Sequence, residues 1–352
     1  MTATRPRLQS LIFEVTQQCN HACRHCYNVW QGQQPAGLAA YPRGSLDTAR
    51  TLDLLAKALD ETICHHVTLT GGEPLLRTDL PELLEFLQKR RVQMTVISNG
   101  RYLTEPTVVS LLKRGVGLFE LPLLSHAREV HDYLSAAPGA WDAVLAGMAN
   151  LRLHRGQFIA AFVATRHNIE HLNETIRLAF AFGARGVMLN RFNPGGRGRE
   201  HLAELLPSAE QVRQALVVAE AASVEFGIPI SCSIPIQPCL IDTRLFPHLG
   251  FGYCAAGSER AYYTLDPLGN LRPCNHTDTI LGNLFEESFT ALIAPERMSA
   301  FTCALPSFCT DCTRRFECQG GCKASAQVCY GSLSAEEPFL KHNRETVQVK
   351  PV

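Results

Sequence analysis

Three cysteines near the start of the chain have a spacing that suits metal chemistry. Cys19, Cys23 and Cys26 follow the pattern C-x3-C-x2-C, and no fourth cysteine stands beside them. A structural zinc site normally takes four protein ligands, so this set is one ligand short. A four-iron cluster held by three thiolates instead leaves one iron open to an outside ligand. The spacing therefore favours an iron–sulfur cluster with an open coordination position.

A second group of cysteines lies in the C-terminal third of the chain. Seven of them form a spaced pattern, in which four residues separate Gly269 from the second cysteine: Cys254, Cys274, Cys309, Cys312, Cys318, Cys322 and Cys329. In a reducing compartment, clustered cysteines more often bind metals than form disulfides. Taken alone, Cys309-x2-Cys312 also fits half of a zinc knuckle.

The elements that must position these residues alternate along the first half of the chain. Predicted strands are 11–16, 66–70, 93–98, 117–124, 158–165 and 186–192. One predicted helix begins at Ser45, which is its expected N-cap. The other predicted helices cover 79–90, 140–154, 169–182 and 208–226. Such alternation indicates a parallel sheet with helices outside it. Six units are too few for a closed eightfold barrel, so we expect an α/β fold with a partial (β/α)6 barrel.

The carboxyl ends of the strands are where a parallel barrel carries its active site. The first cysteine loop directly follows the first strand, and Gly71-Gly72-Glu73-Pro74 ends the second. Glycine allows a backbone to approach a ligand closely, and a carboxylate can pair with an ammonium group. Both motifs are thus expected at one rim of the barrel.

Together these motifs resemble those of the radical SAM (S-adenosylmethionine) enzymes. That family carries C-x3-C-x-aromatic-C, and His25 stands in the aromatic slot. The resemblance implies one SAM-binding [4Fe-4S] cluster on the three N-terminal cysteines. It also implies that the Gly-Gly-Glu-Pro turn, through Glu73, binds the SAM amino group.

Other positions match the family's cofactor segments. Ser98 and Asn99 resemble its ribose-contacting turn, although they also fit a plain polar turn. Asn190 and Arg191 end the sixth strand. They either contact SAM or substrate, as in family members, or have only a structural role at the end of the sheet. Ser125 stands where related enzymes carry an aspartate and is the candidate contact for the SAM carboxylate.

The seven-cysteine pattern resembles the SPASM domain, which implies two auxiliary iron–sulfur clusters, expected to be [4Fe-4S]. The resemblance assigns Cys309, Cys312, Cys318 and Cys329 to one cluster and Cys254, Cys274 and Cys322 to the other. Cys329 is the least secure, because its gap from Cys322 is short. The fourth position of the three-cysteine cluster is open, or is filled by Cys232, Cys239 or Cys303.

Composition limits the remaining possibilities. Lys plus Arg and Asp plus Glu both number 33, so no basic excess points to nucleic acid. Neither a signal peptide nor a membrane span is apparent, which predicts a cytoplasmic protein. We expect three parts: the barrel with its connecting helix (1–235), the SPASM domain (236–335) and a loosely ordered tail (336–352).

The resemblance implies an oxidoreductase that modifies a peptide or protein by cross-linking or oxidation, with a flavodoxin- or ferredoxin-type electron donor. The alternative is tailoring of a small-molecule natural product or cofactor precursor. A non-catalytic zinc or scaffold protein would require these motifs to coincide by accident. Asn275 replaces the aspartate base of sulfatase-maturing relatives, so the catalytic residue is not identified. Because the barrel begins by about residue 11, we expect that any leader peptide is read by a separate protein or not at all.

Overall fold

The computed structural model describes residues 5–33, 40–258 and 260–344, and one curved sheet of eleven strands forms its centre. The strands are β1 (Ser10–Thr16), β2 (His66–Gly71), β3 (Gln93–Ile97), β4 (Val116–Pro122), β5 (Phe158–Ala164), β6 (Val187–Arg191), β7 (Ile230–Cys232), β8 (Leu249–Phe251), β9 (Tyr262–Leu265), β10 (Asn270–Arg272) and β11 (Gly282–Asn283). Their order in the sheet is β11-β10-β9-β1-β2-β3-β4-β5-β6-β7-β8.

Helices connect the strands and form the C-terminal part. The α-helices are α1 (Thr48–Glu61), α2 (Leu80–Lys89), α3 (Glu105–Lys113), α4 (Arg128–Ser135), α5 (Ala140–Leu153), α6 (Leu172–Ala181), α7 (Leu202–Leu205), α8 (Ala209–Phe226), α9 (Phe289–Leu292), α10 (Pro295–Thr302), α11 (Arg315–Cys318), α12 (Lys323–Tyr330) and α13 (Pro338–Arg344). Short 3-10 turns are η1 (Pro74–Leu76), η2 (Ile169–His171), η3 (Gly196–Arg199), η4 (Thr243–Leu245) and η5 (Ser307–Cys309). No helix of these described stretches is long and apolar enough to cross a lipid bilayer.

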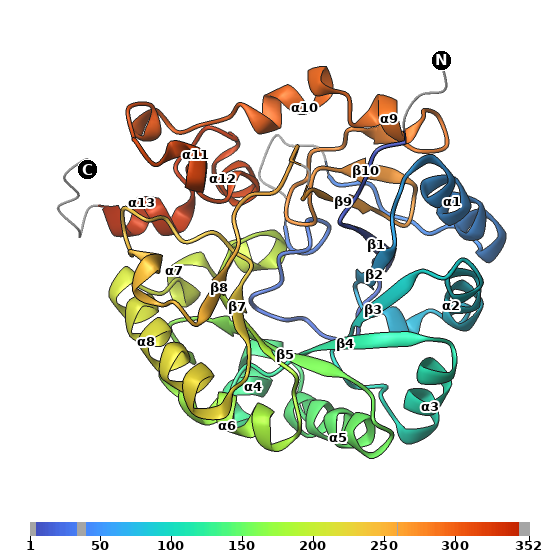
Figure 1. The fold of residues 1–352 in the computed structure, drawn as a ribbon, viewed down its shortest axis with the longest axis horizontal. Coiled ribbons are helices and arrows are strands. Elements are labelled where there is room, and N and C mark those ends of the chain that lie inside the picture. The colour runs from blue at the N-terminus through green and yellow to red at the C-terminus, as the bar shows by residue number, and fades with distance from the viewer. Residues whose placement is uncertain (1–4, 34–39, 259, 345–352) are drawn as a thin grey trace.

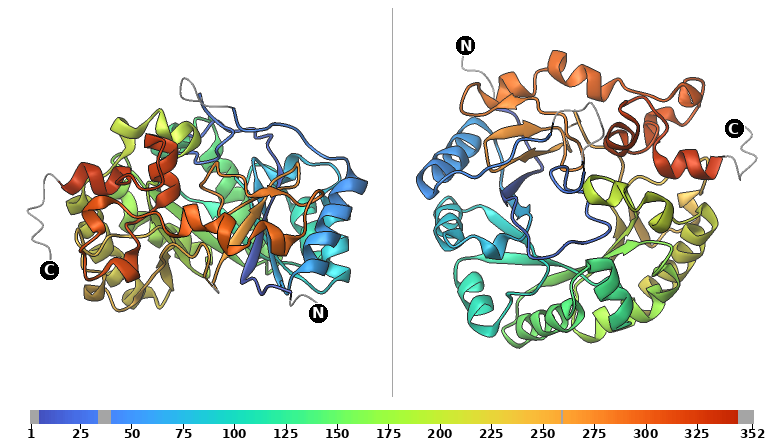
Figure 2. Two further views of the ribbon diagram at one scale, coloured as in Figure 1. Left: turned by 90° about the horizontal axis from the view of Figure 1, so that it is seen from above. Right: turned by 180° about the vertical axis from the view of Figure 1, so that it is seen from behind.

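The strands from β1 to β8 run parallel and curve into an arc, with the helices outside them (Figure 1). The sheet ends at β8 on one side and at β11 on the other, so the barrel does not close. The C-terminal segment, orange to red, lies across the side where the arc is open (Figures 1 and 2). The predicted α/β class and partial barrel are confirmed.

Local sequence explains where most of these elements begin. Strand β1 buries alternate apolar residues such as Leu11 and Phe13, and α8 begins with a capping box between Ser208 and Gln211. The predicted cap at Ser45 is wrong. Helix α1 starts at Thr48, and the Asp47 side chain accepts a hydrogen bond from Arg50 N at 2.8 Å.

The cysteine-rich region is joined to the barrel through the sheet itself. Strand β9 pairs in parallel with β1, and β10 and β11 continue the sheet in antiparallel fashion. Strand β8 lies beyond the expected boundary at residue 235 but pairs with β7. The barrel sheet therefore extends to Phe251, and we propose the division between the two parts after that residue.

The end of the chain is better ordered than the sequence predicted. Residues Pro338–Arg344 form α13, in which Phe339 and Leu340 are buried in the main core. The carboxylate of Glu337 is buried as well and pairs with Arg191 on β6. The expectation of a loose tail is thus wrong for 336–344, because apolar burial and a long-range ion pair hold this segment. Residues 345–352 lie outside the described part.

Candidate active site

A cavity of about 410 Å³ opens inside the barrel. Cys19, Cys23 and Cys26 line it together with Gly71, Gly72, Ser98 and Asn99, which end β2 and β3. Its opposite wall includes Asn190 and, from the C-terminal part, Tyr262, Asn275 and His276. Its size is that of a pocket for a small cofactor and part of a substrate.

The cysteine loop lies directly against the end of β2, and the two glycines make this possible. A Cβ on Gly72 would stand 1.9 Å from the Gln18 carbonyl oxygen, and one on Gly71 would stand 2.3 Å from that of Thr16. The N–H of Glu73 donates to the same Gln18 oxygen at 2.8 Å. The glycines are therefore needed for the loop backbone as well as for any ligand.

A second glycine-rich segment, which follows β6, covers the other side of the loop. Gly198 N donates to the Cys26 carbonyl oxygen at 2.8 Å. A Cβ on Gly196 would stand 2.1 Å from the Asn28 carbonyl oxygen. Between them, Arg197 interacts electrostatically with all three cysteines. The motif Gly-Gly-Arg-Gly after a barrel strand could have indicated this role.

Three thiols that face one cavity fit an iron–sulfur cluster. Burial raises the pKa of Cys26 to about 11 and also raises that of Cys19 and Cys23. Such buried thiols become thiolates when a cationic metal group compensates the charge. Among the described residues, no three His, Cys, Asp or Glu side chains converge on a single ion. The ligands of one cluster bind different irons, so they need not converge in that way.

His25, between Cys23 and Cys26, also lines the cavity. Its ring bonds the Leu134 carbonyl at the end of α4, and its Nδ1 has no hydrogen-bond partner in the described residues. Burial lowers the pKa of His25 to about 4, so the ring is neutral. The aromatic slot of the motif thus fixes the loop to α4.

The carboxylate of Glu73 does not face the cavity as the motif led us to expect. Its side chain is fully enclosed and accepts hydrogen bonds from Leu75 N (3.1 Å), Ser98 Oγ (2.9 Å) and Asn99 N (2.7 Å). A direct pairing of Glu73 with the SAM ammonium group stays a prediction, since three donors of the protein already engage the carboxylate in this structure. Glu73 fixes the Ser98–Asn99 turn, and Pro74 is buried at the start of η1.

The turn that Glu73 holds does face the cavity. Ser98 and Asn99 both line it, and Asn99 Nδ2 donates to Asn20 Oδ1 at 2.7 Å, which ties the turn to the cysteine loop. The structure therefore brings together the cysteine loop, the two glycines and this turn, as the resemblance implied. Their contacts with SAM are a proposal.

Ser125 and Arg191, two predicted cofactor contacts, lie in different surroundings. Ser125 is buried, bonds His171 Nδ1 at 2.7 Å and does not line the cavity. Arg191 does line the cavity. Its Nε and Nη2 donate to the Pro235 carbonyl oxygen, Nη2 also pairs with Glu337, and its buried Nη1 has no hydrogen-bond partner among the described residues. Ser125 therefore does not reach the cavity, whereas a SAM contact by Arg191 stays a prediction.

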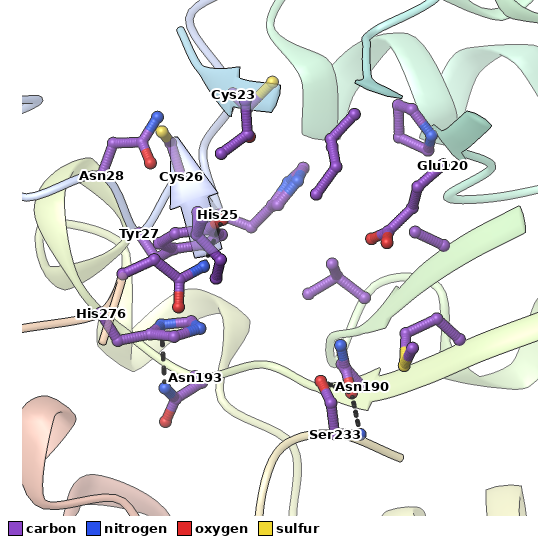
Figure 3. A pocket seen from close by; sticks show the side chains of 18 of the residues that line it. Cys23, His25, Cys26, Tyr27, Asn28, Glu120, Asn190, Asn193, Ser233 and His276 are labelled. Carbon is purple, nitrogen blue, oxygen red and sulfur yellow. Dashed lines mark hydrogen bonds between the residues drawn. The ribbon is translucent and has the colours of Figure 1, made fainter. Parts of the chain in front are cut away.

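Asn190 projects into the cavity, where its Oδ1 accepts from Ser233 N at 2.8 Å (Figure 3). This bond fixes the segment after β7 against the end of β6. Asn190 therefore has a positioning role as well as a place in the wall of the cavity.

Glu120 is a cavity residue that the sequence analysis missed. It lies on β4, is the one carboxylate among the described residues that line the cavity, and points into it (Figure 3). Burial raises its pKa from 4.5 to about 7, although part of the side chain borders the cavity. No hydrogen bond to its carboxylate occurs within the described residues. The sequence did contain a signal for it, because Glu120 is the one charged residue in the otherwise apolar strand "GLFELPLL".

Polar and aromatic side chains connect the cavity with the C-terminal cysteines. The His276 ring lies 4.1 Å from that of Tyr27, whose hydroxyl accepts from Asn275 Nδ2 at 2.9 Å. Asn193 Nδ2 approaches His276 Nδ1 and Cys322 Sγ, both at 3.3 Å. The two cysteine regions are thus separated by one layer of side chains.

A smaller cavity of about 30 Å³ lies behind this layer. Cys254, Cys274 and Cys322 all line it, and Tyr262 and His276 separate it from the larger one. The structure therefore assembles the three cysteines that the resemblance assigned to one auxiliary cluster. Cys232 and Cys303 do not line this cavity.

The other assigned set is only partly brought together. Cys309, Cys312 and Cys318 interact electrostatically with one another around the η5–α11 segment. The thiol of Cys329 instead lies 3.9 Å from the Pro194 carbonyl oxygen, beyond the end of β6.

Comparison with known proteins agrees with this arrangement. The family model of the Radical SAM superfamily matches residues 13–179, and that of SPASM, an iron–sulfur cluster-binding domain, matches residues 254–313. A PqqA peptide cyclase of Xanthomonas campestris pv. campestris (strain B100) is 27% identical over 97% of this chain and 89% of its own length.

Two solved structures share the fold. One is anSMEcpe with bound AdoMet and the Cp18Cys peptide, with a TM-score of 0.71, 16% identity and coverage of 96% of this chain and 94% of that one. The other is Streptococcus suis SuiB bound to S-adenosylmethionine, with a TM-score of 0.69, 15% identity and coverage of 93% and 76%. The chain thus carries a radical SAM domain, matched over residues 13–179, and a C-terminal SPASM domain, matched over residues 254–313.

Proposed function

We propose that this protein uses SAM and iron–sulfur clusters to abstract hydrogen from a peptide substrate, giving a cross-linked or oxidised product. The observation that carries the proposal is the cavity of about 410 Å³ that the N-terminal cysteine loop shares with Asn275 and His276 of the C-terminal part. A relative of nearly the same extent is named a PqqA peptide cyclase, which supports a peptide substrate.

The N-terminal cysteines would hold the cluster that binds SAM. When bound, this reduced cluster supplies the electron that cleaves SAM to methionine and a 5′-deoxyadenosyl radical. Asn99 and the backbone of Gly71 and Gly72 orient the cofactor from the ends of β2 and β3. The enclosing strands exclude water from the space in which hydrogen transfer occurs.

Glu120 gives this cavity a group that can move a proton. Loss of a hydrogen atom and then an electron, taken up by an auxiliary cluster, would leave a cationic carbon centre. A proton is released when this centre is captured by an N–H, O–H or S–H group or forms a double bond. A carboxylate with a pKa near 7 is suited to accept that proton at neutral pH. We therefore assign the Glu120 carboxylate as the proton acceptor, in place of the aspartate that Asn275 replaces.

The C-terminal cysteines would hold two auxiliary clusters, which suits a reaction that removes electrons from the substrate. A protein donor of the flavodoxin or ferredoxin type would supply the first electron, and a separate leader-binding protein would present the peptide. A cytoplasmic location, where thiols stay reduced, completes the proposal.

The test is anaerobic turnover of the reconstituted, reduced protein with SAM. Wild type should release 5′-deoxyadenosine, and Cys23→Ala should abolish the release while Cys303→Ala, which changes an exposed cysteine, should not. SAM cleavage by Cys23→Ala at the wild-type rate would place the reaction elsewhere.

The substrate class needs a second measurement. Short peptides encoded beside the gene, uniformly deuterated, should transfer deuterium into 5′-deoxyadenosine and change in mass. Transfer from a deuterated small-molecule metabolite pool, with none from the peptides, would favour natural-product or cofactor tailoring and refute the peptide proposal.

A further inference from the structure

The segment between β7 and β8 carries Cys239, which is not one of the seven cysteines of the SPASM pattern. It is half-buried and packs against the main core. The sequence left Cys239 as one of three candidates to complete the cluster at Cys254, Cys274 and Cys322. Cys239 does not line the cavity that those three cysteines share.

One close contact docks this segment onto the loop that carries Cys318. The Gln237 Nε2 atom lies so near Gly321 that a Cβ on that glycine would stand 2.1 Å from it. Gly321 N in turn donates to the Cys318 carbonyl oxygen at 2.9 Å. Farther along the segment, Asp242 interacts electrostatically with Arg314. The segment thus lies against the turn from Cys318 to Gly321.

The contact between Gln237 and Gly321 brings Cys239, two residues after Gln237, to the turn that carries Cys318. Cys239 interacts electrostatically with Cys312 and Cys318, and Cys309 interacts with all three. Cys312 N donates to the Cys309 carbonyl oxygen at 3.2 Å, which closes the turn between these two ligands. Four cysteines are the full ligand set of a closed [4Fe-4S] cluster.

Cys329 lies in different surroundings. Helix α12 begins directly after Cys322 and carries Cys329 about 10 Å along its axis. There its Sγ approaches the Pro194 carbonyl oxygen, and Arg199 Nη1 donates to the neighbouring Val328 carbonyl at 3.2 Å. The electrostatic partner of Cys329 among the cysteines is Cys322. The helix thus presents Cys329 to the loop after β6.

We propose that Cys239, and not Cys329, is the fourth thiolate of the auxiliary cluster held by Cys309, Cys312 and Cys318. The chain would then complete this cluster with a ligand from the barrel-side segment, upstream of the SPASM cysteines. The inference rests on the SPASM fold and is independent of the substrate.

The first experiment measures iron in full-length protein that lacks the SAM-binding cluster. In a Cys19→Ala/Cys23→Ala/Cys26→Ala background, anaerobic reconstitution should load about eight iron atoms per chain. Adding Cys239→Ala should reduce this to about four, or leave a three-iron cluster visible by electron paramagnetic resonance. Cys329→Ala and the exposed-site control Cys303→Ala should keep the full iron content.

A serine variant covers the case in which Cys239→Ala fails to fold, which its melting curve will show. Cys239→Ser retains an oxygen ligand, so the cluster should assemble with a shifted reduction potential, whereas Cys329→Ser should leave every potential unchanged. Loss of iron or a shifted potential in a Cys329 variant, with or without the same effect at Cys239, would overturn the assignment. Unchanged iron and potentials in both Cys239 variants would overturn it as well.

Discussion

Glu73 holds one turn of the cavity in place although its own carboxylate does not line the cavity. Its carboxylate accepts hydrogen bonds from Ser98 and Asn99 and is closed off from the cavity. The Asn99 turn faces the cavity and is bonded to the cysteine loop. We therefore expect the effects of Glu73 on SAM to act through the position of this turn.

The substitution Glu73→Gln should lower both stability and SAM affinity. Its amide would turn an NH2 group toward a backbone N–H that now donates to the carboxylate. Leaving a buried donor unpaired costs roughly 1–3 kcal/mol, and displacing the turn should weaken SAM binding.

Thermal melting and calorimetric titration with SAM test this prediction together, with the exposed-site variant Glu82→Gln as control. Weaker SAM binding with an unchanged melting temperature would instead indicate that Glu73 contacts the ligand directly.

Glu120→Gln should remove most product formation, because an amide cannot accept the proton. General-base catalysis contributes about 10²- to 10⁴-fold to a rate. In wild type, the rate of product formation should rise as pH passes through about 7, where Glu120 loses its proton. The rate of product formation, followed by mass spectrometry, is measured against pH for wild type and variant. If the residual activity of Glu120→Gln shows the same pH profile as wild type, Glu120 is not the base.

The same carboxyl group should make stability depend on pH. Its pKa rises from 4.5 to about 7 on folding, so the folded state binds the proton more tightly. Proton binding by Glu120 therefore contributes fully to the free energy of unfolding below the pKa of the unfolded state. This contribution is lost as pH rises through about 7. The loss is at most about 3 kcal/mol, and less where water enters the cavity.

Melting temperatures of wild type and Glu120→Gln at about pH 5 and about pH 8 test this dependence. The variant should gain relative to wild type at the higher pH, and an equal difference at both pH values would contradict a raised pKa.

At the scale of elements, η3 and the cysteine loop form one packed unit. Gly196 has φ +43° and lies where a Cβ would meet the Asn28 carbonyl oxygen. Gly196→Ala should therefore displace the cysteine loop and reduce iron bound by Cys19, Cys23 and Cys26.

Gly227→Ala is the matched control, because its φ is +61° and no atom lies within 4 Å of the new Cβ. Both variants incur about 1–2 kcal/mol of left-handed strain, but only Gly196→Ala should lose iron. Equal iron in both would show that the contact does not position the loop.

At the scale of the molecule, a buried ion pair joins the two parts of the sheet. Arg272 on β10 pairs with Glu14 on β1, donates to the Thr277 carbonyl at 2.8 Å and lies over the Tyr41 ring. Both charged side chains are almost fully buried. The pair therefore fixes the SPASM segment against the first barrel strand.

Arg272→Met should destabilise the protein by about 3–5 kcal/mol, since it leaves Glu14 buried and unpaired. The double variant Glu14→Leu/Arg272→Met should recover much of this loss. Arg90→Met, which removes an ion pair at the surface, should change stability by less than about 1 kcal/mol. Melting temperatures of the holoprotein compare the variants, and failure of the double variant to recover would show that Arg272 acts mainly through its other contacts.

The sequence by itself determined the features that depend on short-range pattern. Apolar periodicity predicted the six barrel strands, and the spacing of Cys19, Cys23 and Cys26 predicted a three-thiolate site after the first of them. Both follow from geometry within a few residues: the period of a strand or helix, and the reach of one loop. The glycines at 71 and 72 belong here too, because only glycine permits such close backbone contact.

The tertiary structure decided which side chains reach a common space. Glu73 is buried behind the Ser98–Asn99 turn, and Arg191 forms an ion pair with Glu337. Glu120 points into the cavity (Figure 3). The tertiary structure also placed Cys239 beside cysteines roughly seventy positions later in the chain. These outcomes depend on contacts between segments distant in sequence, where neither periodicity nor motif spacing specifies which face of an element meets which neighbour.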